Sequence, residues 1–279
     1  MPSLTLWDIL SDPTTLRAFA VGSLMSLCLA VMGVILVLKR YALIGHGLGE
    51  IGFASTAIAA LIGLGGYSLA VSVPLVCLTS LLIMYFDRKS GMGGDVFIGI
   101  FSTVALAVGV IAGKFSSGYS MESSMFGSIL GVSAGYMAAA AALSVLILAV
   151  FILLYTRLFS VTFDETYARA SEMKADSYQF VISLLTSVAV VMGMRVLGAM
   201  MISSFIIFPA LTARRLSGSF KSMIVFAAAS AFVSFTGGML LSVLSQLWPR
   251  HLPVGACVVM VSLFVMLAAM AVSSLKTKK

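Results

Sequence analysis

A histidine and a glutamate, His46 and Glu50, lie four residues apart in an otherwise apolar stretch of the chain. Four residues advance an α-helix by about 6 Å and turn it by about 40°, so the two side chains point the same way. If this helix crosses a membrane from an inner boundary near Arg40, Glu50 lies roughly 15 Å deep, about half the hydrocarbon thickness. An ionisable residue at that depth is a candidate functional residue, because a lone charge in hydrocarbon costs several kcal/mol.

The side chains of this pair suit metal chemistry. Imidazole nitrogen and carboxylate oxygen form a ligand set for zinc, manganese or ferrous iron. Two protein ligands are too few for a closed site, and a second copy of the chain across a twofold axis would supply two more. The alternative is a structural lock, in which a neutral His46 pairs with Glu50 and holds two helices together.

Composition defines the setting of this pair. The chain has 279 residues, of which 61% are hydrophobic and 10% are charged, and its mean hydropathy is +1.13. A soluble domain carries about a quarter charged residues, so the balance excludes an ordinary globular enzyme, a nucleic-acid module and a disordered chain. The chain is predicted to be an integral membrane protein, with lipid around it and no nucleic acid as a partner.

Long apolar runs predict an all-α, polytopic bundle that occupies residues 1–279 as one transmembrane domain. About nine spans are expected, and eight are possible because Arg195 divides the apolar stretch 178–212. We favour two crossings there. The expected spans are 17–38, 46–64, 68–86, 95–113, 134–155, 178–194, 196–212, 221–244 and 254–275.

The basic residues predict the orientation. With the N-terminus outside, nine spans place 13 of the 17 lysines and arginines on the inner side, as the positive-inside rule requires, and the C-terminus in the cytoplasm. These inner residues are Lys39, Arg40, Arg88, Lys89, Arg157, Arg169, Lys174, Arg214, Arg215, Lys221, Lys276, Lys278 and Lys279. The net charge of +7 is therefore interpreted as a topology signal.

Three segments outside the spans have distinct compositions. Residues 1–16 lack the basic start of a signal peptide and are interpreted as a retained interfacial segment. Residues 156–177 form the longest inner connection, and the mixed charges of 163–172 predict a short helix or a solvated connector. Residues 209–221 place small residues around a proline ahead of two arginines, which suits either a short helix against a cytoplasmic partner or simple anchoring.

Five stretches, taken in order, resemble the permease subunits of ATP-binding-cassette importers for zinc, manganese and iron. The likeness covers nearly the whole chain. The stretches are 44–60 (IGHGLGEIGFASTAIAA), 95–107 (DVFIGIFSTVALA), 125–133 (MFGSILGVS), 163–172 (FDETYARASE) and 196–216 (VLGAMMISSFIIFPALTARRL).

This resemblance implies a homodimeric permease in a bacterial cytoplasmic membrane, two cytoplasmic ATPase subunits beneath it and an extracellular metal-binding protein that delivers the ion. It implies no permanently bound cofactor, because the divalent metal is the cargo. It places the metal path at the second span, with His46 and Glu50 as ligands, and a possible secondary cytoplasmic contact at Asp164, Glu165 and Arg169. The implied ATPase-coupling surface consists of Ala210, Leu211, Thr212, Ala213, Arg214, Arg215, Ser217, Gly218 and Phe220.

The second span departs from the family pattern. The family usually carries an Asp, three residues and then a His within G-D-x-x-S-H, whereas this chain has His46 and then Glu50, with Gly49 in place of the serine. One imidazole and one carboxylate remain, but their order is reversed. The reversal changes which ligand lies deeper and bears on the identity of the metal or of another cargo.

Two further function classes compete with the permease hypothesis. A self-contained secondary metal carrier would also suit an H-x-x-x-E pair, although such carriers usually present more intramembrane ligands. An intramembrane hydrolase is disfavoured because the H-E-x-x-H spacing is absent. The sequence also has no G-x-x-x-x-G-K-[S/T] phosphate-binding loop, so ATP chemistry would come from a partner.

Overall fold

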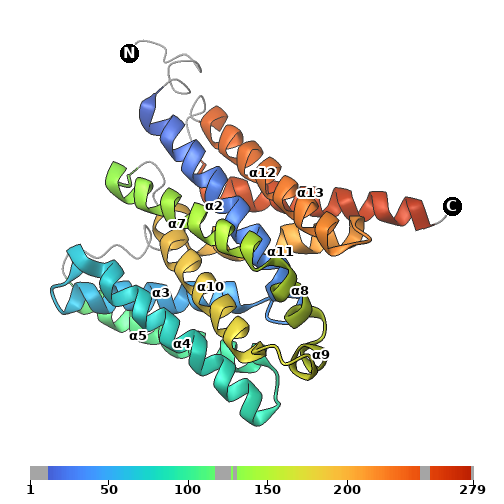
Figure 1. Cartoon of the computed structure of the whole chain (residues 1–279). Coiled ribbons are helices and arrows are strands. Elements are labelled where there is room, and N and C mark those ends of the chain that lie inside the picture. The colour runs from blue at the N-terminus through green and yellow to red at the C-terminus, as the bar shows by residue number, and fades with distance from the viewer. Residues whose placement is uncertain (1–11, 117–126, 128–130, 246–251, 278–279) are drawn as a thin grey trace.

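The computed structural model describes residues 12–116, 127, 131–245 and 252–277. These residues form a helical bundle without strands (Figure 1). The α-helices are α2 (Pro13–Leu38), α3 (Ile44–Leu61), α4 (Ser68–Ser90), α5 (Gly94–Phe115), α7 (Ala134–Leu153), α8 (Tyr155–Phe163), α9 (Glu165–Ala170), α10 (Ala175–Leu197), α11 (Ala199–Leu216), α12 (Phe220–Ser245) and α13 (Val254–Thr277), and a 3-10 turn, η1 (Gly65–Tyr67), precedes α4.

Eight helices of the described chain are long and apolar enough to cross a membrane, which confirms the predicted polytopic bundle. The remaining expected span, 46–64, is α3, which falls outside this group. Its 18 residues include His46, Glu50 and four glycines, all of which lower its hydropathy. The helix is nevertheless enclosed, because α5, α4, α11 and α10 pack around it. Most residues of α3 are therefore buried against these four helices.

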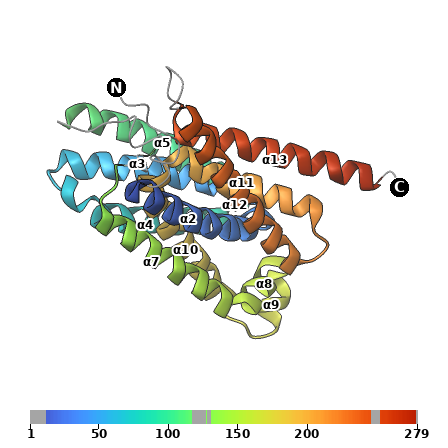
Figure 2. The same cartoon turned by 90° about the horizontal axis from the view of Figure 1, so that it is seen from above.

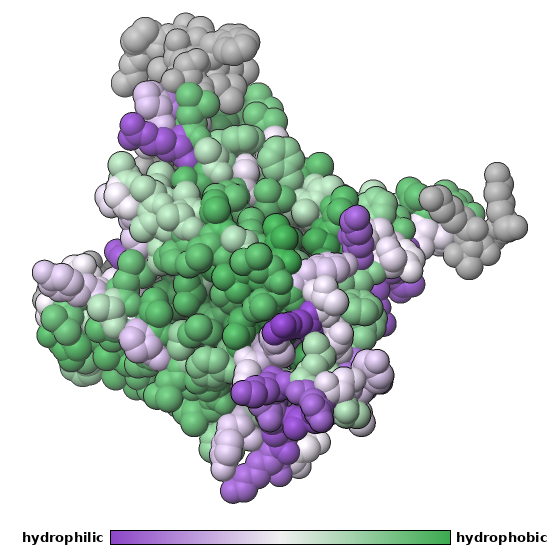
Figure 3. Space-filling view, viewed as in Figure 1, coloured by the Kyte–Doolittle hydropathy of each residue, from purple (hydrophilic) through white to green (hydrophobic). Residues whose placement is uncertain are grey.

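The helices divide into an inner and an outer group. In α2 and α10, 78% and 72% of the apolar window is buried, against 22% in α4 and in α5. The outer helices present large apolar side chains such as Leu78, Val104 and Ile111 outward, as a lipid-facing surface requires. Figure 3 shows a broad hydrophobic face, with polar residues gathered toward the end that carries α8 and α9. The C-terminal end of α13 projects beyond the other helices (Figure 2).

Small residues allow close contacts between helices. A Cβ atom added at Gly33 would lie 2.4 Å from the backbone oxygen of Ile206, so α2 and α11 touch at this glycine. Serines join α4 to its neighbours: the Ser55 hydroxyl donates to that of Ser72 at 2.7 Å, and the Ser80 and Ser183 hydroxyls are 2.5 Å apart. Close contacts of this kind hold helices in a setting where lipid offers no competing polar partner.

The break in the stretch 178–212 lies at Gly198, where φ is 87°. Two helices, α10 and α11, form there as expected, but the division expected at Arg195 is wrong. Arg195 belongs to the last turn of α10 and lies over the ring of Tyr136, 5.0 Å from its centroid. A positive φ is easily adopted by glycine and costly for a residue with a Cβ atom, so Gly198 ends the helix and the charge does not.

Other helix boundaries also differ from those expected from the sequence. Helix α2 begins at Pro13, so residues 13–16 of the expected interfacial segment are helical, while residues 1–11 lie outside the described residues. The short helix expected within 163–172 is present as α9, and the Asp164 carboxylate accepts from the Tyr167 amide at 2.8 Å to cap it. Residues 209–216 form no separate short helix, because α11 continues through Pro209 to Leu216.

Candidate metal site

His46 and Glu50 face each other along one side of α3. The Nε2 atom of His46 lies 3.3 Å from Oε1 of Glu50. The His46 side chain is 58% exposed and that of Glu50 is 19% exposed in the single chain. The expected geometry is therefore present, with the imidazole reachable from outside and the carboxylate more sheltered.

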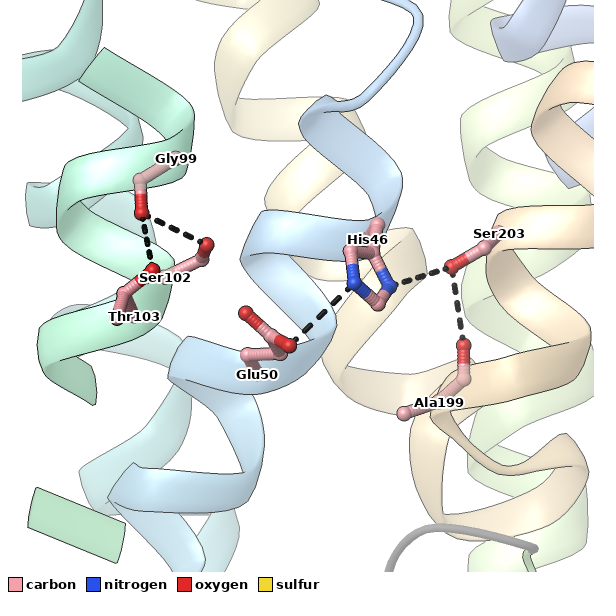
Figure 4. A network of polar contacts seen from close by, with 7 residues as sticks. All are labelled: His46, Glu50, Gly99, Ser102, Thr103, Ala199 and Ser203. Atoms are coloured by element: carbon pink, nitrogen blue, oxygen red, sulfur yellow. Dashed lines mark hydrogen bonds and ion pairs between the residues drawn. The ribbon is translucent and has the colours of Figure 1, made fainter. Parts of the chain in front are cut away.

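Helix α11 brings a third polar side chain to this pair. The Oγ atom of Ser203 lies 3.4 Å from His46 Nδ1 and 3.3 Å from the backbone oxygen of Ala199, to which the hydroxyl donates. Figure 4 shows the resulting chain of contacts from Glu50 through His46 and Ser203 to Ala199. The two ring nitrogens of His46 thus meet groups from two different helices.

The glycines of α3 permit this approach. A Cβ atom at Gly45 would lie 2.3 Å from Ile206 Cδ1 of α11, and one at Gly47 would lie 2.5 Å from Ile98 Cγ2 of α5. A larger residue at either position would force these isoleucine side chains or their helices to shift. The glycines of α3 thus allow α11 and α5 to lie close to it.

Helix α5 carries two side chains with hydroxyl groups in the part that lies beside α3. The hydroxyls of Ser102 and Thr103 both donate to the backbone oxygen of Gly99, at 3.2 and 2.8 Å (Figure 4). Ser102 is adjacent to Gly47 of α3, because a Cβ atom there would lie 3.6 Å from Ser102 Cβ. The surroundings of the pair therefore include neutral oxygen groups.

This arrangement can hold a metal ion only in part. Within the described residues, no group of three or more His, Cys, Asp and Glu side chains converges on one point. One chain therefore offers one nitrogen and one oxygen ligand, and other positions remain for water or a second copy. Such an open set suits an ion that must leave again more than a permanently held one.

The predicted ATPase-coupling surface divides into buried and exposed residues. Arg214 and Arg215 are exposed in the last turn of α11, Leu211 and Gly218 are also exposed, and Ser217 is partly exposed. The remaining predicted members are buried within the chain: Ala210, Thr212, Ala213 and Phe220. In this arrangement, these buried residues position the exposed ones and do not form the outer surface.

The predicted secondary contact lies in a polar cluster. The guanidinium of Arg169 lies 2.8 Å from Oδ1 of Asp176, which also pairs with Arg88 at 2.5 Å. Asp164 caps α9, and the side chain of Glu165 lies outside the described part of the structure. Arg169 and Asp164 thus have structural partners that fix α9 beside the start of α10.

Comparison with known proteins places this arrangement in a family. Residues 11–273 match the ABC 3 transport family. The chain belongs to this family. The High-affinity zinc uptake system membrane protein ZnuB of Haemophilus influenzae is 32% identical over 75 residues, which cover 27% of this chain and 29% of that relative. The match thus spans less than a third of the curated relative.

Two solved structures share the fold of this ABC 3 family member. PsaBC from Streptococcus pneumoniae, in complex with Fab, superimposes with a TM-score of 0.82 at 22% identity, over 95% of this chain and 94% of that one. The second structure is an inward-facing conformation of a transporter described as metal-chelate type ABC. It superimposes with a TM-score of 0.73 at 16% identity, over 92% of this chain and 85% of that one.

An aromatic cluster joins α8 to the start of α12 in this ABC 3 family chain. The Phe220 ring lies 5.5 Å from that of Tyr155, 5.2 Å from Phe159 and 5.7 Å from Phe163. Sequence reasoning missed this contact between α8 and the start of α12. The four-residue spacing of Tyr155, Phe159 and Phe163 was an available signal, because it aligns three rings on one helical face.

Proposed function

We propose that this chain is the membrane-spanning permease subunit of an ABC importer that carries a divalent transition-metal ion into the cell. Separate ATPase subunits supply the energy. The observation that carries the proposal is the His46–Glu50 pair, 3.3 Å apart on the enclosed helix of an ABC 3 family chain. An imidazole and a carboxylate in this setting are suited to zinc, manganese or ferrous iron.

The chemistry of transport follows from the incomplete ligand set. An ion must shed water to enter a protein path, and His46 Nε2 with Glu50 Oε1 replaces two of those waters. A second copy of the chain would bring two more ligands to a shared axis. Binding is therefore favourable enough to capture the ion and weak enough to release it.

The proposed partners follow from the same reasoning. The sequence has no phosphate-binding loop, so two ATPase subunits are expected at the cytoplasmic side, near exposed Arg214 and Arg215. An extracellular metal-binding protein delivers the ion. The bacterial cytoplasmic membrane is the expected location, and the partial match to a zinc uptake protein supports zinc as the first metal to test.

The source of energy tests this proposal. Cells whose own copy of the gene is deleted and restored from a plasmid are given radioactive zinc or manganese. We expect the restored cells to import at least one of the two, and we expect uptake to stop when cellular ATP is depleted. A protonophore under conditions that preserve ATP should leave uptake in place.

The opposite dependence of uptake on ATP and protonophore would contradict the proposal and identify the chain as a secondary carrier. In that case, uptake would stop with the protonophore, continue after ATP depletion and persist when the purified chain alone is placed in vesicles. Failure of an ATPase subunit to co-purify with the tagged chain in mild detergent would point the same way.

A further inference from the structure

The hydroxyl of Ser203 lies between a backbone carbonyl and the histidine of the candidate metal site. Its Oγ atom is 3.3 Å from the Ala199 oxygen and 3.4 Å from His46 Nδ1 (Figure 4). Ser203 is partly buried on α11, whereas His46 is on α3, 157 residues away in sequence. The contact therefore depends on how the two helices pack.

The donors and acceptors fix the direction of these contacts. A serine hydroxyl has one proton to donate, and a carbonyl oxygen can only accept. With the Ser203 proton directed to the Ala199 oxygen, the Oγ atom has only lone pairs left for His46. Nδ1 must then be the donor in the contact with His46, which assigns the proton of a neutral imidazole to Nδ1.

This assignment determines what the other ring nitrogen presents. In a neutral imidazole with its proton on Nδ1, Nε2 carries a lone pair. That lone pair faces the Glu50 carboxylate, 3.3 Å away. Two electron-pair donors that face each other repel unless a cation lies beside both, so the arrangement is complementary to a metal ion.

We propose that Ser203 is a positioning residue, which holds His46 with Nδ1 protonated and Nε2 turned toward Glu50 for metal binding. The inference rests on the proposed function, since it assumes that His46 and Glu50 bind the transported metal. Hydrogen bonds from a ligand histidine's second nitrogen fix the ring orientation and raise its basicity. Ser203 carries out this task from a neighbouring helix without touching the ion.

The first test compares three substitutions in cells that take up radioactive zinc or manganese. Ser203→Ala should raise the KM for the metal about 10-fold and leave the maximal rate within about twofold, because it weakens binding without removing a ligand. Ser203→Thr keeps the hydroxyl and should restore the KM. Ser204→Ala is the matched control, because that buried hydroxyl donates to the Met201 oxygen at 2.8 Å.

The second test observes the ring directly. The sequence contains two histidines, so His251→Gln leaves His46 as the one imidazole signal in protein labelled with nitrogen-15 histidine. In the purified full chain saturated with zinc, nuclear magnetic resonance should report the ring protonated on Nδ1, with Nε2 on the metal. Ser203→Ala should shift this population toward protonation on Nε2, and Ser203→Thr should not. An unchanged tautomer in Ser203→Ala overturns the inference.

The outcomes separate this inference from the function on which it rests. Loss of uptake in His46→Ala and Glu50→Ala with wild-type KM in Ser203→Ala would overturn the role of Ser203 alone. Wild-type uptake in all of these variants would overturn the metal site as well. A KM that rises equally in Ser203→Ala and Ser204→Ala would show general disturbance of α11, which also contradicts a specific role.

Discussion

One imidazole and one carboxylate, those of His46 and Glu50, lie on the same face of α3. Nε2 of His46 and Oε1 of Glu50 are 3.3 Å apart, a distance that follows from their spacing of four residues. Nothing in this geometry requires the imidazole to come first. A cation that binds both groups needs their proximity, while their order sets which ligand lies deeper.

We therefore predict that exchanging the two ligand types preserves transport. The double variant His46→Asp, Glu50→His restores the order common in the family and keeps one ligand of each type on the same face. Uptake of radioactive zinc should stay at about a tenth of wild type or more, with a reduction because the contact of His46 with Ser203 is lost. Absence of uptake from a double variant that purifies normally would show that the order itself is essential.

The two ligands could be predicted from sequence because their relation is local. Ser203 could not, because its contact with His46 joins residues 157 apart and requires the packing of α11 on α3. Many serines in the described chain bond only to a carbonyl of their own helix, as Ser204 does. Sequence pattern alone does not distinguish such a serine from one that also meets a ligand.

At the element scale, α11 connects the candidate metal site to the exposed arginines at its last turn. It carries Ser203 near its first turns and Arg214 and Arg215 in its last turn. Eleven residues of helix span about 16 Å, so one continuous helix reaches both, with Pro209 between them. A displacement of α11 at the arginine end therefore acts directly on the surroundings of His46.

Charge reversal at the end of α11 should uncouple transport. In the double variant Arg214→Glu, Arg215→Glu, we expect less ATPase to co-purify and at least about a 10-fold loss of uptake, since apposed charges of the partner would be repelled. Lys89→Glu, an exposed basic residue at the end of α4, is the control. Normal ATPase recovery with the double variant would remove these arginines from the coupling surface.

A helix contact gives a prediction on stability. Gly33→Ala places a methyl group 2.4 Å from the Ile206 backbone oxygen, which no side-chain rotation can relieve. We expect a loss of about 1–3 kcal/mol in stability, seen as a lower melting temperature of the detergent-purified chain. Gly135→Ala, where nothing lies within 4 Å, should change stability by no more than about 1 kcal/mol. Equal melting temperatures for the two variants would contradict the close packing of α2 and α11.

The elements were largely predictable because apolar runs are long, but two details were not. A charge at Arg195 suggested a boundary, whereas the backbone conformation of Gly198 determines it. The sequence also does not show whether a small residue is buried or exposed. Ala210 and Ala213 would suit an exposed coupling surface, but both are buried. Phe220 is buried because it packs against rings of α8, which is distant from it in the sequence.

At the scale of the whole molecule, the site is incomplete in one chain. Two ligands per chain leave an ion partly hydrated, and a twofold pair would supply four. If both copies contribute to one path, an inactive copy should impair its partner. Equal co-expression of wild type and His46→Ala with random pairing should leave about a quarter of wild-type uptake, in proportion to the fully wild-type dimers. Retention of about half would indicate independent paths.

Whether the metal passes His46 and Glu50 is tested by the uptake of radioactive zinc and manganese in cells that carry His46→Ala or Glu50→Ala as their sole copy. Both variants should reach the membrane and assemble at wild-type levels, yet import no more metal than cells without the gene. His251→Ala, which alters the other histidine of the sequence, should import normally. Wild-type uptake of both metals in His46→Ala and Glu50→Ala would contradict a metal path through this pair.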